Sequence, residues 1–446
     1  MHTSKHLSIF YRCIFVIPLF FYQLNLYMTS SHHPIHNNER IIIMDALRGL
    51  AILGIFIANL GAGFSFYNEA APNTGPYFHS LDKQFLFWEH VFIEGKFYSI
   101  FSFLFGWGFA IQIARSEVKG ISPASFMKRR LGFMFLLGLA HLLLLWTGDI
   151  VAFYAMVGFV LLWIRNRSDR TLFITAITCL LLPAVLYFLK MKFPVLLAPA
   201  GVLYKTGEAI DKSISGVAGF DDFIKKLKTG NYLFQLKTLL PGVFYRLGDL
   251  LFQDRFFKVL GMFITGYLLG RNGRYKTILI NKSLLLKVAL IGLAVGLPAN
   301  YVLATYMKKG GYYQMNMDGM IQTLAYTAGV STLALAYISL FFLLALTKPG
   351  IQVIKILQPP GKMAFSNYIM HSLIGSIIFY GMGFGMVGEV GPFYYTLLAF
   401  IVFAAQIVLS TIWLRYFIYG PVEWLWRSAT YKKWQPLLKN KNHTTA

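Results

Sequence analysis

Charged residues are scarce in this chain. Only 13% of its 446 residues are charged, whereas 57% are hydrophobic and 17% are aromatic. A soluble domain of this size cannot bury so much apolar surface, so the composition excludes an ordinary soluble protein. It predicts an all-α fold, a polytopic integral membrane helical bundle with the lipid bilayer as its main partner.

Cysteine is nearly absent as well. Cys13 and Cys179 both lie in apolar runs, and two residues are too few for a disulfide framework or a zinc site. The sequence also has no Walker loop, no dinucleotide fingerprint and no HExxH pair. These absences disfavour a redox or nucleotide-hydrolysing enzyme, and we expect no metal site.

Acidic residues are few compared with basic ones. The chain has 18 Asp and Glu against 41 Lys and Arg, which gives a formal net charge of +23. In a membrane protein such an excess usually marks the cytoplasmic loops. We therefore do not interpret it as nucleic-acid binding, which requires a basic soluble face.

The hydrophobic pattern predicts about ten core spans. They are Arg40–Gly63, Phe97–Ala114, the stretch from Lys128 to Asp149, Ile150–Ile164, Leu172–Leu189, Phe256–Leu269, Leu284–Thr305, Leu324–Leu346, Met363–Phe384 and Phe393–Trp413. Gly106 and Gly108 in the second span are expected to permit close helix approach. Residues 348–362, which contain three lysines, Pro359 and Gly361, are expected to form a short basic loop.

Residues 1–39 form an N-terminal extension. Ile9 to Leu26 is apolar but interrupted by polar residues. It has three open interpretations: an uncleaved signal-like anchor, an extra span, or sequence upstream of a true start at Met28. The remaining chain divides into an N-terminal membrane region at 40–347, a C-terminal membrane region at 348–431 and a basic tail at 432–446.

Loop charge predicts the orientation. The loops after spans two, four, six and eight and the tail are rich in Lys and Arg, whereas the loops after spans one and nine are acidic. This alternation places both core ends in the cytoplasm, and residues 67–94 and Asp149 outside. The long connection 190–255 is assigned to the outside on weaker grounds. Within it Phe223 to Leu250 is expected to include an interfacial amphipathic helix.

One span combines charge with a titratable group. In KRRLGFMFLLGLAHLLLLWTGD, Arg130 and His141 are eleven residues apart, about three helical turns, so they share one helix face about 16 Å apart. Ionisable groups inside a membrane tend to mark sites, and His141 is expected near mid-depth. The alternative is an anchoring arginine and a histidine that merely hydrogen-bonds a neighbour.

The first span repeats this pattern. Asp45 and Arg48 are positioned to pair, and Arg48 and Asn59 are again eleven residues apart. We expect Asp45, Arg48 and Asn59 to face Arg130 and His141 across a polar cleft that opens to the cytoplasm. The alternative is a capped helix with an anchoring ion pair.

Several stretches resemble the YeiB family of bacterial membrane proteins, grouped as domain of unknown function 418. They are MDALRGLAILGIFIAN, EGKFYSIFSFLFGWG, RRLGFMFLLGLAHLLLLWTGDIVAFYA, GKMAFSNYIMHS, GMGFG and GPVEWLWRSATY. Together they extend over most of residues 40–431. The chain departs from the family pattern at His371, where glutamine is expected, and residues 1–27 have no counterpart in the usual family start.

That family is similar to the membrane acyltransferases, namely the acyltransferase-3 proteins and heparan glucosaminide acetyltransferase. Arg130 and His141 match their basic residue, ten intervening residues and histidine, and Asp45, Arg48 and Gly49 match their Asp-x-x-Arg-Gly. The resemblance implies transfer of an acyl group, commonly acetyl, from cytoplasmic acyl-CoA to a small-molecule or glycan acceptor at the outer face of the bacterial inner membrane.

The residue chemistry fits that activity. The basic residues Lys128, Arg129, Arg130 and Arg48 are suited to the phosphates of acyl-CoA. His141, grouped with Asp45 and Asn59 as the catalytic set, is suited to deprotonate the acceptor or to accept the acyl group, and Asn59 or Asn367 to stabilise the oxyanion. A transporter of a small or lipid-linked solute and a non-enzymatic scaffold remain alternatives. The oligomeric state is open, with a homodimer as one possibility.

Overall fold

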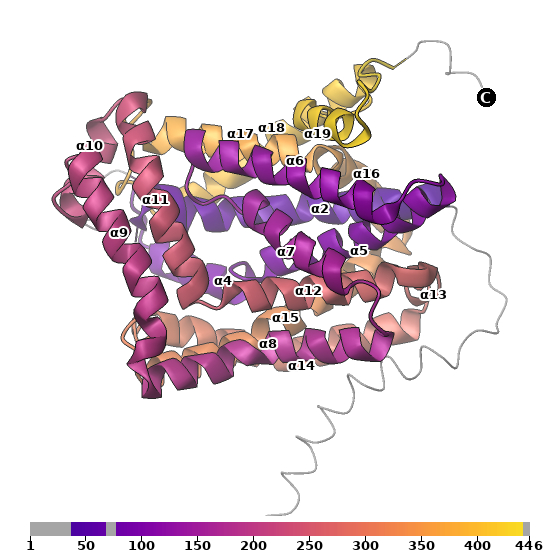
Figure 1. Cartoon of the computed structure of the whole chain (residues 1–446), viewed down its shortest axis with the longest axis horizontal. Coiled ribbons are helices and arrows are strands. Elements are labelled where there is room, and N and C mark those ends of the chain that lie inside the picture. The colour runs from indigo at the N-terminus through magenta and orange to yellow at the C-terminus, as the bar shows by residue number, and fades with distance from the viewer. Residues whose placement is uncertain (1–36, 68–76, 440–446) are drawn as a thin grey trace, which may run out of the picture. The chain divides into compact units, whose positions relative to one another are not determined.

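The computed structural model describes residues 37–67 and 77–439, and most of them are helical (Figure 1). Contacts divide the chain into two units, Met1–Arg40 and Ile41–Ala446. The apolar segment Ile9–Leu26 and the alternative start at Met28 lie outside the described residues. Among the residues that are described, β pairing is confined to an isolated bridge between Phe417 and Leu438, so the all-α prediction is confirmed.

The helices follow one another with short connections. In chain order they are α2 (Asn37–Asn59), the π-helix η2 (Leu60–Ser65), α4 (Asp82–Phe92), α5 (Lys96–Val118), α6 (Pro123–Leu144), α7 (Val151–Ile164), α8 (Asp169–Lys192), η3 (Pro194–Leu197), α9 (Ala198–Ile214), α10 (Phe220–Thr229), α11 (Tyr232–Phe252), α12 (Arg255–Gly270), η4 (Arg271–Gly273), α13 (Tyr275–Ile278), α14 (Lys282–Met307), α15 (Met317–Ala345), α16 (Lys348–Lys362), α17 (Ala364–Phe379), α18 (Pro392–Tyr416) and α19 (Pro421–Tyr431).

Six helical segments are long and apolar enough to cross a membrane. They are Ile42–Ser65, Asp82–Val118, Asp169–Lys192, Lys282–Met307, Met317–Ala345 and Pro392–Tyr416. The helices α7 and α17 are apolar but shorter. Each of the ten predicted spans contains one helix, but ten membrane crossings remain a prediction.

Two segments expected as loops contain helices. The predicted outer connection 67–94 includes α4, which joins α5 in one apolar segment from Asp82 to Val118. The predicted basic loop 348–362 is α16. Thr347 caps that helix by accepting a hydrogen bond from the backbone N–H of Gly350, and Pro349 lies in the first turn, where no intrahelical donor is needed. Lysine and proline content therefore misled the loop prediction.

The long connection after α8 is helical throughout most of its length. The predicted amphipathic helix at Phe223–Leu250 is divided between α10 and α11, because Gly230 ends the first and Asn231 caps the second. Figure 1 shows α9, α10 and α11 at one end of the Ile41–Ala446 unit and α13 at the other. The helix α11 packs against α9 and α6, so it belongs to the body of this unit.

Glycines set two close helix crossings. A Cβ at Gly106 in α5 would overlap the backbone of Phe263 in α12, which confirms the close approach predicted for this residue. At Gly108 the nearest such atom is the Arg48 guanidinium, 3.8 Å away, so this position is roomier. A second crossing joins α2 and α16 through Gly49 and Gly361, where any side chain would overlap the opposite backbone.

The connections gather at two opposite ends. Arg271 and Arg274, after the sixth predicted span, form ion pairs with Asp169, after the fourth. Near the other end, the N–H of Gly388 donates to the carbonyl of Ser65, which joins the loops after spans nine and one. This grouping agrees with the alternation that loop charge predicts, and the cytoplasmic assignment of the basic end remains a prediction.

Cysteine labelling tests that orientation. In a Cys13→Ala/Cys179→Ala background, an impermeant maleimide added to intact cells is expected to modify Ser80→Cys and to spare Val118→Cys, because the basic connections face the cytoplasm. Both positions are exposed, Val118 by 90%, so access to the side chain does not limit the reaction. Labelling of both variants after permeabilisation is the control, and the reverse pattern would contradict the orientation.

Candidate functional site: a buried Ser–His–Asp set beside a polar cavity

His141 lies between a carboxylate and a hydroxyl. Its Nδ1 is 2.9 Å from Oδ2 of Asp149, and its Nε2 is 2.8 Å from Oγ of Ser372. An ionised carboxylate can only accept, so Nδ1–H donates to Asp149 and the neutral imidazole accepts at Nε2 from the Ser372 hydroxyl. All three side chains are buried, with at most 3% exposure. This is the arrangement of a nucleophile, a base and an orienting acid.

Local sequence explains how Asp149 reaches the imidazole. The helix α6 ends at Leu144, and His141 lies in its last turn. Asp149 then uses Oδ1 to accept from the N–H of Ala152 at the start of α7, 2.7 Å away. Gly138 leaves no room for a side chain against Ala152, which lets the two helices close around the carboxylate.

A large cavity adjoins this set. It has a volume of about 1050 Å³ and is lined by residues of α2, η2, α4, α5, α9, α10, α11, α12, α14, α15, α17 and α18 and by the α6–α7 loop. Thr147, Gly148 and Ile150 of that loop line the cavity, whereas Asp149 between them hydrogen-bonds His141. Tyr368 also lines it, with its ring 5.2 Å from that of His141. The loop and this tyrosine therefore separate the cavity from the imidazole.

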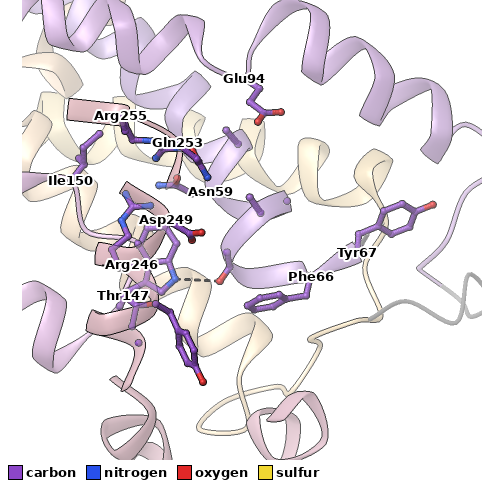
Figure 2. A pocket seen from close by; sticks show the side chains of 18 of the residues that line it. Asn59, Phe66, Tyr67, Glu94, Thr147, Ile150, Arg246, Asp249, Gln253 and Arg255 are labelled. Atoms are coloured by element: carbon purple, nitrogen blue, oxygen red, sulfur yellow. Dashed lines mark hydrogen bonds between the residues drawn. The ribbon is translucent and has the colours of Figure 1, made fainter. Parts of the chain in front are cut away.

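Asn59 is the predicted site residue that lines the cavity. Its amide has no hydrogen-bond partner within the described part of the chain, and Figure 2 shows it among the side chains that line the cavity. Asn367, the other expected oxyanion donor, instead donates its amide N–H groups to the carbonyl of Pro360 and the hydroxyl of Ser410. Of the two asparagines, Asn59 is therefore the one placed to meet a ligand.

The predicted basic residues lie at the other end of their helices. The Arg130 guanidinium stacks on Trp426 of α19 at 3.7 Å, and Arg129 donates to the carbonyl of Thr430. Lys128 is exposed. Two motifs of the sequence, one in α6 and one at the C-terminus, are thus joined by cation–π and backbone contacts.

Asp45 and Arg48 form the predicted ion pair beside this cluster. The charges of Lys362 and Arg427 also act on Asp45, and Arg427 and Arg48 act on Arg130. Burial lowers the pKa of Lys362, an effect that Asp45 opposes. One carboxylate therefore faces several cations at this end.

The C-terminal motifs hold α17 in place. Glu423 of GPVEWLWR accepts hydrogen bonds from the backbone N–H groups of Phe365 and Ser366 and, at 2.5 Å, from the Ser366 hydroxyl. Burial raises the pKa of Glu423, although these bonds favour its charged form. Since α17 carries Ser372, this cap fixes the helix that supplies the hydroxyl to His141.

His371, adjacent to Ser372, has different surroundings. Its Nε2 is 2.8 Å from Oε1 of Gln406, and its ring stacks on Phe56 at 3.9 Å. It is buried and has no carboxylate partner among residues 37–67 and 77–439. The two buried histidines therefore differ in chemistry, and only His141 has the set of partners that a general base requires.

The structure arranges the predicted residues as three groups. The Arg130 cluster and the Asp45–Arg48 pair lie at one end, Asn59 lines the cavity, and His141 is buried with partners that were not predicted. Within the described residues no hydrogen bond or ion pair links His141 to the predicted residues of α2. These contacts do not form the single predicted cleft that would contain Asp45, Arg48, Asn59, Arg130 and His141.

Sequence reasoning missed the partners and the cavity charges. The sequence marked Asp149 only as the outer end of the third predicted span, and it did not single out Ser372. A polar cluster in an apolar helix was the available signal for Ser372. Arg246, Asp249 and Arg255, which line the cavity, all fell in the long connection 190–255, for which the sequence predicted only an interfacial helix.

Fold and site together define an all-helical, multi-pass type of protein with a Ser–His–Asp set buried among its helices. The family model described as "Protein of unknown function (DUF418)" matches residues 269–433. The uncharacterized protein YxaH of Bacillus subtilis (strain 168) is 31% identical over 420 residues, which cover 92% of this chain and 99% of that protein.

A second similar protein comes from another bacterium. The uncharacterized protein YeiB of Escherichia coli (strain K12) is 28% identical over 414 residues, covering 90% of this chain and 98% of that protein. No solved structure matches. The chain belongs to the DUF418 family of YeiB-like proteins, as its motifs predicted.

Proposed function

We propose that this protein is an integral-membrane acyltransferase that moves an acyl group, acetyl in the simplest case, from cytoplasmic acyl-CoA to an acceptor at the outer face of the bacterial inner membrane. The observation that carries the proposal is His141 held between Asp149 and Ser372. A histidine with only a structural role needs a single hydrogen-bond partner, whereas this imidazole contacts an acid at one nitrogen and a potential nucleophile at the other.

The reaction would proceed in two transfers. His141 Nε2 takes the proton of Ser372 Oγ as that oxygen attacks the thioester carbonyl, and the departing CoA thiolate receives the proton from the imidazolium. The acceptor hydroxyl or amine then loses its proton to Nε2 and attacks the seryl ester, which returns the hydroxyl to Ser372. Asp149 holds the imidazole in the required tautomer and stabilises its charged form in both steps.

The donor phosphates are assigned to the basic end. Lys128, Arg129, Arg130 and Arg48 remain the proposed binding residues, since the cluster has several cations against Asp45. Arginine and lysine suit phosphate oxygens. Trp426, on which Arg130 stacks, would support the guanidinium or a planar adenine.

The acceptor is assigned to the cavity at the opposite end. Asn59 lines it with an unengaged amide, and Tyr368 forms part of the wall toward His141. Movement of Tyr368 is the smallest change that would connect the cavity with Nε2, because its ring lies directly against the imidazole. Asn59 and Asp45 stay in the proposed catalytic group through the resemblance of their motifs.

A carrier of a small or lipid-linked solute is the second candidate. The cavity volume of about 1050 Å³ favours it, because this is ample for a solute. A carrier alone, however, requires no imidazole between an acid and a hydroxyl.

Release of CoA from acetyl-CoA tests the proposal. The full chain in lipid nanodiscs is expected to release about one CoA per protein in a first turnover that needs no acceptor. His141→Ala is expected to slow this release by at least about 10²-fold, because the general base is removed. His371→Gln is the matched control and should retain the burst. Equal CoA release by wild type and His141→Ala, or flux of a solute with no CoA release, would contradict the proposal.

A further inference from the structure

One end of the cavity has cations without ion-pair partners. Arg246 of α11 and Arg255 of α12 both line it, together with Lys258 one turn further along α12. Arg255 donates to the side chain of Gln253 at 2.9 Å, and Arg246 has a 3.4 Å contact with the carbonyl of Asp149. Within the described ranges none of the three cations forms an ion pair.

The neighbouring carboxylates are engaged elsewhere. Asp249 acts electrostatically on both arginines but accepts its hydrogen bond from Tyr204, 2.7 Å away. Glu94 pairs with His90. Asp149 and Asp254 also act on Arg246 and Lys258, and they pair with His141 and Lys190. All four carboxylates thus have other partners, and Figure 2 shows Arg246, Asp249 and Arg255 on the same side of the cavity. Since none of these carboxylates forms an ion pair with Arg246 or Arg255, the two guanidinium groups favour an incoming anion.

Several polar atoms of residues that line the cavity lack partners. Nε of Arg246 and Oε1 of Gln235 and Gln322 are buried without a hydrogen bond to any described residue, and all three residues line the cavity. A buried donor or acceptor that stays unpaired is energetically unfavourable. The arginine nitrogen can donate a hydrogen bond to a ligand acceptor, and the two amide oxygens can accept hydrogen bonds from ligand hydroxyl or amine groups.

Aromatic rings support the cations and line the remaining wall. Lys258 Nζ lies 4.1 Å above the ring of Tyr326, and the Arg255 guanidinium lies 5.5 Å from the ring centre of Tyr98. Such stacking orients a cation while leaving donors directed away from the ring. The cavity combines fixed cations, orphan acceptors and aromatic surfaces.

We propose that this cavity binds a hydroxylated organic anion, whose phosphate or carboxylate is held by Arg246 and Arg255 and whose hydroxyls meet Gln235, Gln322 and Asn59. Planar guanidinium groups bind either anion through paired N–H donors. The volume of about 1050 Å³ accommodates a molecule larger than one sugar ring. That this anion is the acyl acceptor rests on the proposed function, whereas its binding does not.

Titration of the full chain in phosphatidylcholine nanodiscs tests the site without acyl-CoA. By calorimetry, D-glucose 1-phosphate or D-glucuronate is expected to bind at least about tenfold more tightly than D-glucose, because glucose has no charge for the arginines. Arg246→Gln should weaken anion binding by about tenfold to a hundredfold. Lys237→Gln, an exposed charge on the same helix, should leave it unchanged, and Arg246→Lys should fall between.

The outcomes are distinct. Equal binding of glucose and both anions, no binding of either anion at about 10 mM, or wild-type affinity in a folded Arg246→Gln protein would overturn the site. Melting curves identify variants that fail to fold, in which case Arg255→Lys and Arg246→Lys carry the test. Adding phosphatidylglycerol to the nanodiscs distinguishes the source of the anion. If this lipid competes with the sugar anions, the natural anion is a lipid headgroup, and if it does not compete, the natural anion is a soluble molecule. Failure of CoA release would leave these results intact.

Discussion

Asp149→Asn is expected to slow CoA release from acetyl-CoA by about 10³- to 10⁴-fold while leaving the fold intact. The oxygen of the new amide would keep accepting from the N–H of Ala152, which directs the amide N–H₂ toward Nδ1 of His141. Two donors cannot share that bond, so the imidazole would move its proton to Nε2. Nε2 would then have no lone pair to accept the proton of Ser372.

A single-turnover assay on purified protein in nanodiscs measures this effect. Asp169→Asn is the matched control, because Asp169 forms ion pairs with Arg271 and Arg274 near the start of α8, away from the imidazole. It should keep the rate within about twofold, as surface changes usually do. An Asp149→Asn protein as fast as this control would remove Asp149 from the mechanism.

Ser372→Ala separates the two possible roles of His141 in the same assay. If the seryl ester forms, the acceptor-independent burst of CoA should disappear, since no oxygen remains to take the acyl group. A burst that persists would assign the acyl group to the imidazole. CoA release that then requires an acceptor would indicate direct attack, with His141 as base and Ser372 only as its hydrogen-bond partner.

Gly361→Val is expected to give the largest loss of stability. Glycines Gly49 and Gly361 meet where α2 crosses α16, and a Cβ at Gly361 would overlap the carbonyl oxygen of Asp45. The obstacle is helical backbone, so the helices must separate. Overpacking of this kind costs about 3 kcal/mol, and the melting temperature should fall by about 5 °C or more.

Thermal unfolding monitored by fluorescence-detected gel filtration measures that loss. Gly132→Ala is the matched control, because Gly132 is also inside a helix but has no neighbouring atom within 4 Å of the position that a Cβ would occupy. It should be neutral or slightly stabilising, since alanine favours helix. Equal melting temperatures for Gly361→Val and Gly132→Ala would show that α2 and α16 do not need this contact.

Much of the fold was determined by the sequence alone. An 18-residue apolar window identifies a membrane-spanning helix without reference to its neighbours, because every backbone group bonds within the helix. Loop charge predicted which connections share an end, and the contacts of Asp169 and Ser65 agree. The spacing of Arg130 and His141 singled out α6, and motifs in six stretches placed the chain in its family.

Segments with mixed signals were decided by packing. The residues 348–362 contain lysine, glycine and prolines, which locally favour a loop, but contact with α15 and α18 makes them helical. The α9–α11 region was hard to predict for a related reason. Its helices are only partly buried, and the positions of their apolar residues depend on which helices they pack against, which the sequence spacing does not show.

The site itself depended on tertiary structure. His141 and Asp149 are close in sequence, but Ser372 is 231 residues from His141. Helix periodicity reports which residues share a face and not which helices face each other. Arg246 and Arg255 likewise can be recognised as candidate ligand-binding residues only in the tertiary structure, where α11 and α12 line a common cavity. The sequence determined the helices and the candidate histidine, and the arrangement of helices decided its partners, because hydrogen bonds across a bundle depend on distance in space.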